Sequence, residues 1–454
     1  MGDRKFKEYN THQALLLPPS LQDWLPDDHL AYFIEEVVNN LDLSEIYNDY
    51  ASTTGAGAPA FSPQLLLNVL LYSYATGTFS SRKIAKRCIE DVGCRYLAAQ
   101  QTPNFRTFIK FRSRHLDKFQ NIFIQVLHFA KEAGLIKLGH VSVDGSKFKA
   151  NASKHQSMSY SYMLKAEKKL SKEIEELLKH AQEIDELEDK KYGDYDGYSL
   201  PEHLAHKEGR LKTIKAAKAR IEQRAKERAE AEEQRRKDEA VTRKKAGKKV
   251  KRYRKSPDSK PKPKEQENFT DTDSRIMRDG ATKSFVQAFN CECAVDSLEK
   301  LIVANEVVNS GSDSQFLIPV LDQVKSIFGK FPKQVTADGG YKSDANFKKL
   351  NERNIEGFVA CGKEVYDPSK RAPKGRIPSS ATLIDRMKRK LLTKAGRKIY
   401  KKRKVTAEPP FAWIKKVLGF TQFSLRGLKK VKGEFDIVCL ALNLRRMAKM
   451  DIEI

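Results

Sequence analysis

The sequence predicts an α/β protein: a mixed sheet with packed helices, preceded by an all-α N-terminal domain and interrupted by an inserted helical hairpin. Apolar residues recur at the 3.6-residue helical period through the first 135 residues. From residue 138 the pattern changes to the alternation and Val-rich runs of strands, which later alternate with amphipathic helices. Residues 155–265 instead combine heptad-like apolar spacing with dense charge, which separates them from the sheet.

The N-terminal region, residues 1–135, contains two long helical patterns, "PQLLLNVLLYSYATG" and "NFRTFIKFRSRHLDKFQNIFIQVLHFAKEAG". Between them, "TGTFSSRKIAKRCIEDVGCRYL" has the pattern of a turn, a short basic helix and a second turn, as in helix-turn-helix DNA readers. Its candidate DNA-contacting residues are Arg82, Lys83, Lys86 and Arg87. A helical bundle with a solvated basic face explains the same pattern equally well.

The sheet is predicted from five strand patterns. The first starts at residue 138 and ends at Asp144-Gly145, because this dipeptide favours a turn. Three strands in a row and then helix–strand alternation indicate a mixed sheet. The other strands are predicted at 284–297, 301–310, "QVTADGG" and 357–361, with helices at "DSQFLIPVLDQVKSIF", at 343–352 and from about residue 408.

Residues 155–265 are predicted to form an antiparallel hairpin of two long helices, with the turn-rich segment 192–202 between them. Apolar residues from Met163 to Ile184 and from Leu204 to Ala225 keep a compatible register. Residues 241–264 then hold twelve Lys or Arg and one acid, together with three prolines. We interpret this run as a flexible tether with incidental attraction to DNA, because nothing in it could read base edges.

Composition indicates a polyanionic partner. Lys and Arg total 85 against 59 Asp and Glu, a formal charge of +26, and nucleic acid is the first candidate. No apolar run approaches the roughly 18 residues of a spanning helix, and the start lacks the apolar segment of a signal peptide. We therefore expect an intracellular protein without a membrane partner. The six cysteines are scattered without zinc-site spacing, so we expect reduced thiols.

Three acids are candidates for a catalytic metal site. Asp144 in "VSVDGSKFKAN" and Asp338 in "QVTADGGY" each end a predicted strand, and such ends converge at one edge of an α/β sheet. Glu408 precedes two prolines that suit a first helical turn, with Lys415 two turns further on. Carboxylates without His or Cys suit Mg²⁺ or Mn²⁺, and two such ions can serve phosphoryl transfer. Each acid alone also fits an ordinary turn or helix start; their order within a basic chain favours the joint interpretation.

Several blocks of sequence occur in an order typical of one family: "FSPQLLLNVLLYSYATGTFSSRKIAKRC", "VDGSKFKANASKHQSMSY", "DTDSRIM", "TADGGY" and "EPPFAWIKKVLGFTQFSLRGLKKVKGEFDIVCLALNLRRM". Over nearly the whole chain they resemble the DDE transposases of bacterial insertion sequences, in the IS-four-like superfamily and its eleven-eighty-two group. The resemblance implies an RNase H-like catalytic domain. It also implies that Asp144, Asp338 and Glu408 form the catalytic, metal-binding triad.

The same resemblance implies DNA contacts around the glutamate. Lys415 takes the place of a basic residue that contacts DNA near the cut, and Tyr400 and Lys404 take the tyrosine and basic positions ahead of the glutamate. Tyr400 lies four residues before Lys404, whereas three is the commoner spacing, so Arg403 is an alternative basic partner.

The implied organisation is a helical DNA-binding domain at 1–135, a catalytic domain at 136–154 and 266–454, and the insertion at 155–265 between its first two strands. The implied activity is binding of terminal inverted repeats, then cleavage and strand transfer with two Mg²⁺ or Mn²⁺ ions. Element ends and target DNA are the expected partners of a dimer or larger complex in the bacterial cytoplasm, at the nucleoid. A non-catalytic DNA-binding relative and an RNase H-like nuclease that cuts without joining are the alternatives.

Overall fold

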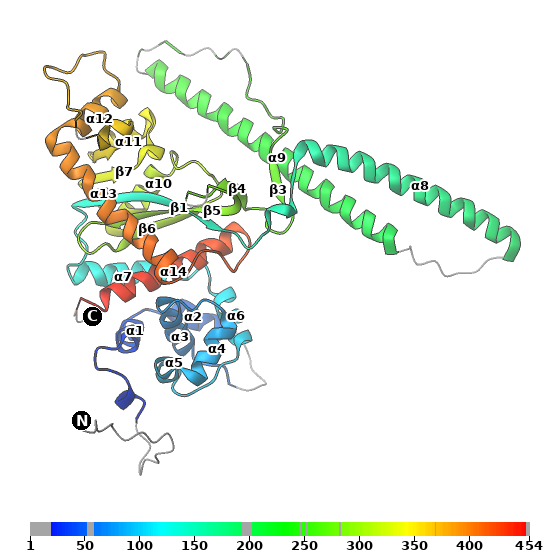
Figure 1. The fold of residues 1–454 in the computed structure, drawn as a ribbon, viewed down its shortest axis with the longest axis horizontal. Helices are drawn as coiled ribbons and strands as arrows, with labels where there is room; N and C mark the ends of the chain where they lie inside the picture. The colour runs from blue at the N-terminus through cyan, green and yellow to red at the C-terminus, as the bar shows by residue number, and fades with distance from the viewer. Residues whose placement is uncertain are drawn as a thin grey trace, which may run out of the picture.

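A computed structural model describes residues 20–51, 59–192, 202–245, 247, 249–250, 253, 255–280, 283–367 and 369–450, without the side chains of 51, 180–192, 202–205 and 364. The N-terminal "MGDRKF" and most of the predicted turn at 192–202 lie outside the described residues. A sheet domain and a group of N-terminal helices form the body of the molecule, and a long helical hairpin projects from it (Figure 1).

A six-stranded mixed sheet lies at the centre of the body (Figure 1). Its strands are β1 (His140–Lys149), β4 (Arg275–Arg278), β5 (Phe285–Asp296), β6 (Ile302–Val308), β7 (Gln334–Ala337) and β8 (Glu356–Val359). β1 pairs antiparallel with β5 and parallel with β7, and β7 pairs parallel with β8. β6 and β4 both pair antiparallel with β5, which gives the order β6-β5-β1-β7-β8 with β4 at one end of β5. This order confirms the predicted mixed sheet.

Helices supply the parallel connections and cover the sheet. They are α10 (Leu317–Phe328), α11 (Asp344–Glu352), α12 (Leu383–Leu392), α13 (Lys394–Ala412), the π-helical turn η5 (Trp413–Val417) and α14 (Leu428–Met447). α10 joins β6 to β7, which lie on opposite sides of β5 and β1. α11 joins β7 to its parallel neighbour β8, a pairing that needs a crossover. α10 ends at Gly329, whose positive φ of 75° suits a residue without a side chain.

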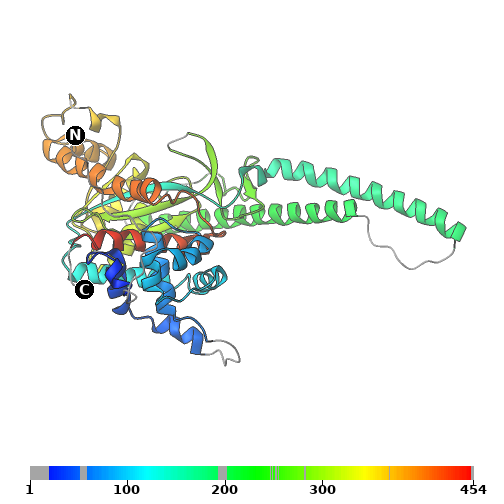
Figure 2. The ribbon, with the colours of Figure 1, turned by 60° about the horizontal axis from the view of Figure 1, so that its bottom comes forward.

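The N-terminal helices share one hydrophobic core with the sheet. They are α1 (Leu30–Asn39), α2 (Ser44–Ala51), α3 (Pro63–Ala75), α4 (Ser81–Glu90), α5 (Val92–Leu97), α6 (Phe105–Arg114) and α7 (Phe119–Glu132). α14 is buried along most of its length because it packs against α3 and α7 and also against β6 (Figure 2). One continuous cluster of buried side chains therefore runs from α1 to α14. No helix in the described parts of the chain is both long and apolar enough to cross a membrane.

The insertion follows β1 and ends before β4. It comprises β2 (Ser157–Ser159), α8 (Tyr160–Tyr192), α9 (Glu202–Lys245) and β3 (Gln266–Asn268). α8 packs on the first half of α9 around Met163, Ile214 and Ile221, and the two-stranded β2–β3 ladder closes the base. Glu267 of β3 is fully buried and bonds two arginines of α9, one of them Arg224 at 2.7 Å.

The second half of α9 continues past this base, and the basic segment that follows returns along it. Arg236 donates to the carbonyl of Lys255 at 2.8 Å and lies over the ring of Tyr253, whose hydroxyl donates to Glu239 at 3.1 Å. The interpretation of 241–264 as a free tether is thus wrong for its described residues. Helix–segment contacts of this kind have no periodic pattern in the sequence.

Candidate active site

The two strand acids lie where β1 and β7 separate. The parallel pairing of β1 with β7 ends at Val143 and Ala337. Asp144 is the next residue after Val143, and Asp338 is the next residue after Ala337. β7 ends there, whereas β1 continues to Lys149 because β5 still pairs with it. Asp144 is therefore inside β1 instead of at the predicted strand end, and Asp144-Gly145 forms no turn. Asp338 does end its strand, and its carboxylate accepts a hydrogen bond from the amide of Gly340 at 2.8 Å.

Glu408 lies near the end of a helix, which corrects the expected helix start. α13 begins at Lys394, where the side chain of Thr393 caps it, and it continues through Pro409 and Pro410. Pro409 and Pro410 have no amide to donate, so the carbonyls of Val405 and Thr406 lack their usual helical hydrogen bonds, and the chain changes to the π-helical turn η5 shortly afterwards. α13 packs on β1 and β7, which places Glu408 beside the strand acids.

Arg403 joins two of the three acids. Its Nη1 donates to Asp144 Oδ2 at 3.0 Å and its Nη2 donates to Glu408 Oε1 at 3.4 Å. Burial raises the pKa of Asp144 to about 6; Arg403 opposes this shift, whereas the charges of Asp338 and Glu408 add to it. The structure thus brings together the side chains of Asp144 and Glu408, and places Asp338 close enough to affect the charge of Asp144.

The residue types suit a hard divalent cation. The donors are carboxylate oxygens, and the negative charges repel one another at a partly buried position, which a cation would relieve. The guanidinium of Arg403 supplies part of the positive charge that relieves this repulsion. Among the residues that the structure describes, no three His, Cys, Asp or Glu side chains are arranged closely enough to hold an ion.

A cleft of about 920 Å³ opens beside Glu408 between α12, α13 and the segment after β8. Arg403 and Lys404 both line it, but Arg403 bonds the acids, whereas the side chain of Lys404 is exposed. Tyr400 is buried, shares a hydrogen bond of 3.0 Å with Tyr366, and has a pKa that burial raises. Five further cations line the cleft, at Arg371, Lys394, Arg397, Lys398 and Lys401.

Lys415 reaches β1 just after Asp144. The residue lies in the π-helical turn η5. Its ammonium donates to Ser146 Oγ and to the carbonyl of Lys147, both at 2.7 Å, and lies over the ring of Phe148. Burial lowers its pKa. Both acceptors are neutral, so these hydrogen bonds leave its positive charge uncompensated.

The predicted DNA-reading residues of α4 divide into two groups. Arg82 and Lys83 are exposed, as is Lys86, which pairs with Glu90. Arg87 instead points into the helical domain, where it bonds Thr76 at the end of α3 and Asp91 at the end of α4 and lies over a tyrosine ring.

Two buried residues behind the acids were not among the sequence candidates. Glu292 of β5 is opposite Gly145 in the strand register, and it accepts a hydrogen bond from Tyr341, which follows Asp338 by three residues. Burial raises the pKa of Glu292 to about 8. The sequence did contain a sign of it, because a glutamate stands between two cysteines inside a predicted strand.

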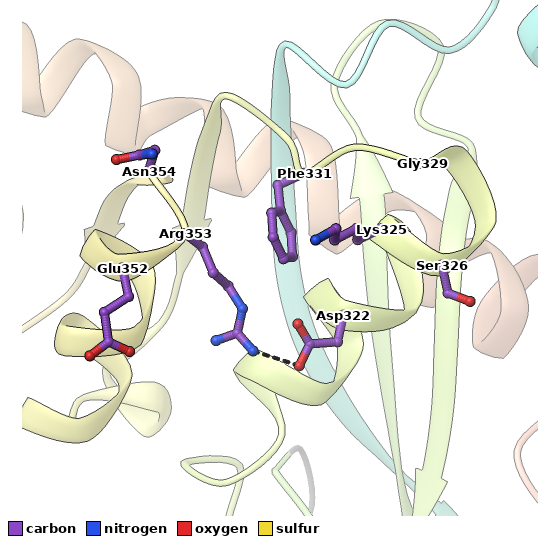
Figure 3. A pocket seen from close by; sticks show the side chains of 8 residues that line it. All are labelled: Asp322, Lys325, Ser326, Gly329, Phe331, Glu352, Arg353 and Asn354. Atoms are coloured by element: carbon purple, nitrogen blue, oxygen red, sulfur yellow. Dashed lines mark hydrogen bonds and ion pairs between the residues drawn. The ribbon is translucent and has the colours of Figure 1, made fainter. Parts of the chain in front are cut away.

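A second hollow, of about 660 Å³, lies between α10 and α11 (Figure 3). Its lining residues precede β7 and β8, so it is at the opposite edge of the sheet from Asp144 and Asp338. Arg353 pairs with Asp322 at 2.7 Å, and Arg353 and Lys325 both lie over Phe331. These contacts satisfy the charged groups, and we assign the hollow no function.

Comparison with known proteins gives two matches to family models. Residues 19–114 match a model described as a transposase domain, and residues 261–444 match a model described as a transposase DDE domain. The second range includes Asp338 and Glu408 and begins after Asp144 and most of the insertion. No curated protein and no solved structure matched the chain.

Proposed function

This chain is an insertion-sequence transposase of the DDE type, and we propose that it binds the terminal inverted repeats of its element, cuts there in a metal-dependent reaction, and joins the freed 3′-hydroxyl to target DNA. The observation that supports the reaction most strongly is the position of the acids. Asp144 and Asp338 follow the last paired residues of neighbouring parallel strands, and Arg403 connects Asp144 to Glu408.

In this proposal Asp144, Asp338 and Glu408 hold the divalent ions, Mg²⁺ or Mn²⁺. When bound, such ions stabilise negative charge on the reacting phosphate and increase the acidity of an attacking water or hydroxyl. Hydrolysis and strand transfer are both in-line attacks on a phosphodiester, so one site serves both steps. Arg403 neutralises the carboxylates between which it lies.

The cationic residues guide the DNA. Phosphates of the strand leading to the cut lie along the cleft at Lys404 and its neighbouring cations, and Lys415 directs its charge toward the phosphate beside Asp144. Arg82, Lys83 and Lys86 contact the element end from the N-terminal helices. Because two ends are processed together, we propose that the chain acts as a dimer or larger complex on DNA.

The test is cleavage of a labelled DNA that carries the inverted repeats flanking the gene. Asp144→Asn, Asp338→Asn and Glu408→Gln are each expected to reduce cleavage to background while end binding, measured by gel shift, stays near wild type. Asp322→Asn, which changes an acid at the opposite edge of the sheet, is the control and should cut normally. Normal cutting by a triad variant would remove that residue from the site, and cleavage without joining would favour the nuclease.

A further inference from the structure

Glu292 packs directly behind the backbone that carries Asp144. Its side chain is fully buried on β5, opposite Gly145 of β1. A Cβ atom at residue 145 would lie 2.8 Å from both carboxylate oxygens of Glu292. Only a glycine at residue 145 therefore allows the Glu292 carboxyl group to lie this close to the β1 backbone. This contact fixes the position of the β1 backbone immediately after Asp144.

The same carboxyl group also holds the segment that follows Asp338. Tyr341 is fully buried, and its hydroxyl donates a hydrogen bond to Glu292. Between the two lie only Gly339 and Gly340, and the amide of Gly340 donates to the Asp338 carboxylate. The backbone position of Asp338 is thus linked through a short turn to the same buried side chain.

Neighbouring polar groups fix the orientation of Glu292. Asn290 Nδ2 donates to Glu292 Oε1 at 2.7 Å and to Asp313 Oδ1 at 2.8 Å. Lys147 of β1 donates to the same Asp313 oxygen at 2.9 Å. Two strands and the loop before α10 therefore meet at one hydrogen-bonded network, so Glu292 has a single well-defined position.

We propose that Glu292 is a positioning residue that holds Asp144 and Asp338 at the separation needed to share divalent ions. The proposal rests on the proposed metal-dependent function. A residue serving stability alone would be better replaced by an apolar side chain of similar volume, because burying a carboxyl group is unfavourable. Burial raises the pKa of Glu292 to about 8, so near pH 7 the side chain is mainly neutral and its hydrogen bonds, more than its charge, do the positioning.

The test measures Mn²⁺ binding to the DNA-free full chain by electron paramagnetic resonance of the free ion, beside thermal unfolding of each variant. Tyr341→Phe and Glu292→Leu are expected to weaken Mn²⁺ binding on the order of 10-fold, as loss of an outer-shell partner does. Glu292→Gln keeps a neutral hydrogen-bonding group of the same length and should bind like wild type. Asn290→Ala removes one hydrogen-bond donor to Glu292 and should also weaken Mn²⁺ binding. It serves as the test variant if Tyr341→Phe or Glu292→Leu fails to fold.

Tyr74→Phe is the matched control, because Tyr74 is a fully buried tyrosine whose hydroxyl accepts a hydrogen bond from Arg112 at 2.7 Å, far from the acids. It should lower stability without changing Mn²⁺ affinity. Unchanged Mn²⁺ affinity in Tyr341→Phe, or an equal loss in Tyr74→Phe, would overturn the positioning role alone. If wild type binds no Mn²⁺, or if Asp144→Asn binds Mn²⁺ as well as wild type does, the proposed metal site is refuted and the positioning role is refuted with it.

Discussion

Asp144→Asn is expected to make the metal-free protein more stable above neutral pH, because the fold holds an ionised carboxylate where burial disfavours it. The pKa of Asp144 is raised from 3.8 to about 6, so the folded state binds this proton more tightly than the unfolded chain. That favourable contribution is complete below the unfolded pKa and is lost as the pH rises through about 6. A shift of roughly two units corresponds to about 3 kcal/mol.

The assay is urea unfolding in the presence of EDTA, followed by the fluorescence of Trp413 in a Trp24→Phe background. The advantage of Asp144→Asn over wild type should grow from under ~1 kcal/mol near pH ~4 to ~3 kcal/mol near pH ~8. Asp322→Asn is the control and should show no such growth. The reasoning is refuted if the difference between Asp144→Asn and wild type is the same at both ends of this range.

Two further predictions concern charged partners. Arg403→Gln should raise the pKa of Asp144 in the metal-free protein further, because Arg403 is the main group that lowers it. The loss of stability that urea unfolding in EDTA detects with rising pH should therefore extend to higher pH in this variant. Lys404→Gln on the same helix should leave that pH range in place, and an unmoved range in Arg403→Gln would contradict the role of Arg403. Glu267→Gln leaves two arginines of α9 without their buried partner and should destabilise the base of the insertion by about 2 kcal/mol, seen as faster limited proteolysis within 246–264. Glu173→Gln breaks a more exposed pair on the same hairpin and should change this rate little; equal rates would rule out Glu267 as the anchor.

Local patterns predicted five of the six strands because those strands are regular and bounded by turn residues, whereas β4 is only four residues long and has an arginine at each end. The segments around Asp144 and Asp338 were identified for the same reason. The end of the first strand was not, because Asp-Gly is also a turn sequence and only the pairing partner decides between the two. β5 continues alongside β1 beyond Asp144, and that partner lies about 150 residues away in the chain.

The position of Glu408 was mispredicted by a rule that is usually sound. Two consecutive prolines favour a helix start, yet here packing of α13 on β1 and β7 keeps them inside the last turns of a helix. Arg403 shows the same limitation in another form. Spacing left Arg403 and Lys404 as alternatives, and only the rotation of α13 about its axis shows which of the two faces the acids.

The net charge of +26 overstates the surface available to DNA, because several cations are used inside the protein. Arg87 links the ends of α3 and α4, Arg112 bonds a buried tyrosine, and Arg403 bonds the acids. Among the described residues, the exposed cations that can meet phosphates include Arg82 and Lys83 of α4 and Lys404 beside the cleft next to Glu408. Since each neutralised phosphate releases counterions, the salt dependence of end binding should depend on such exposed cations and little on the total charge. A basic composition therefore identifies the kind of partner, whereas the pairing of each cation determines where that partner binds.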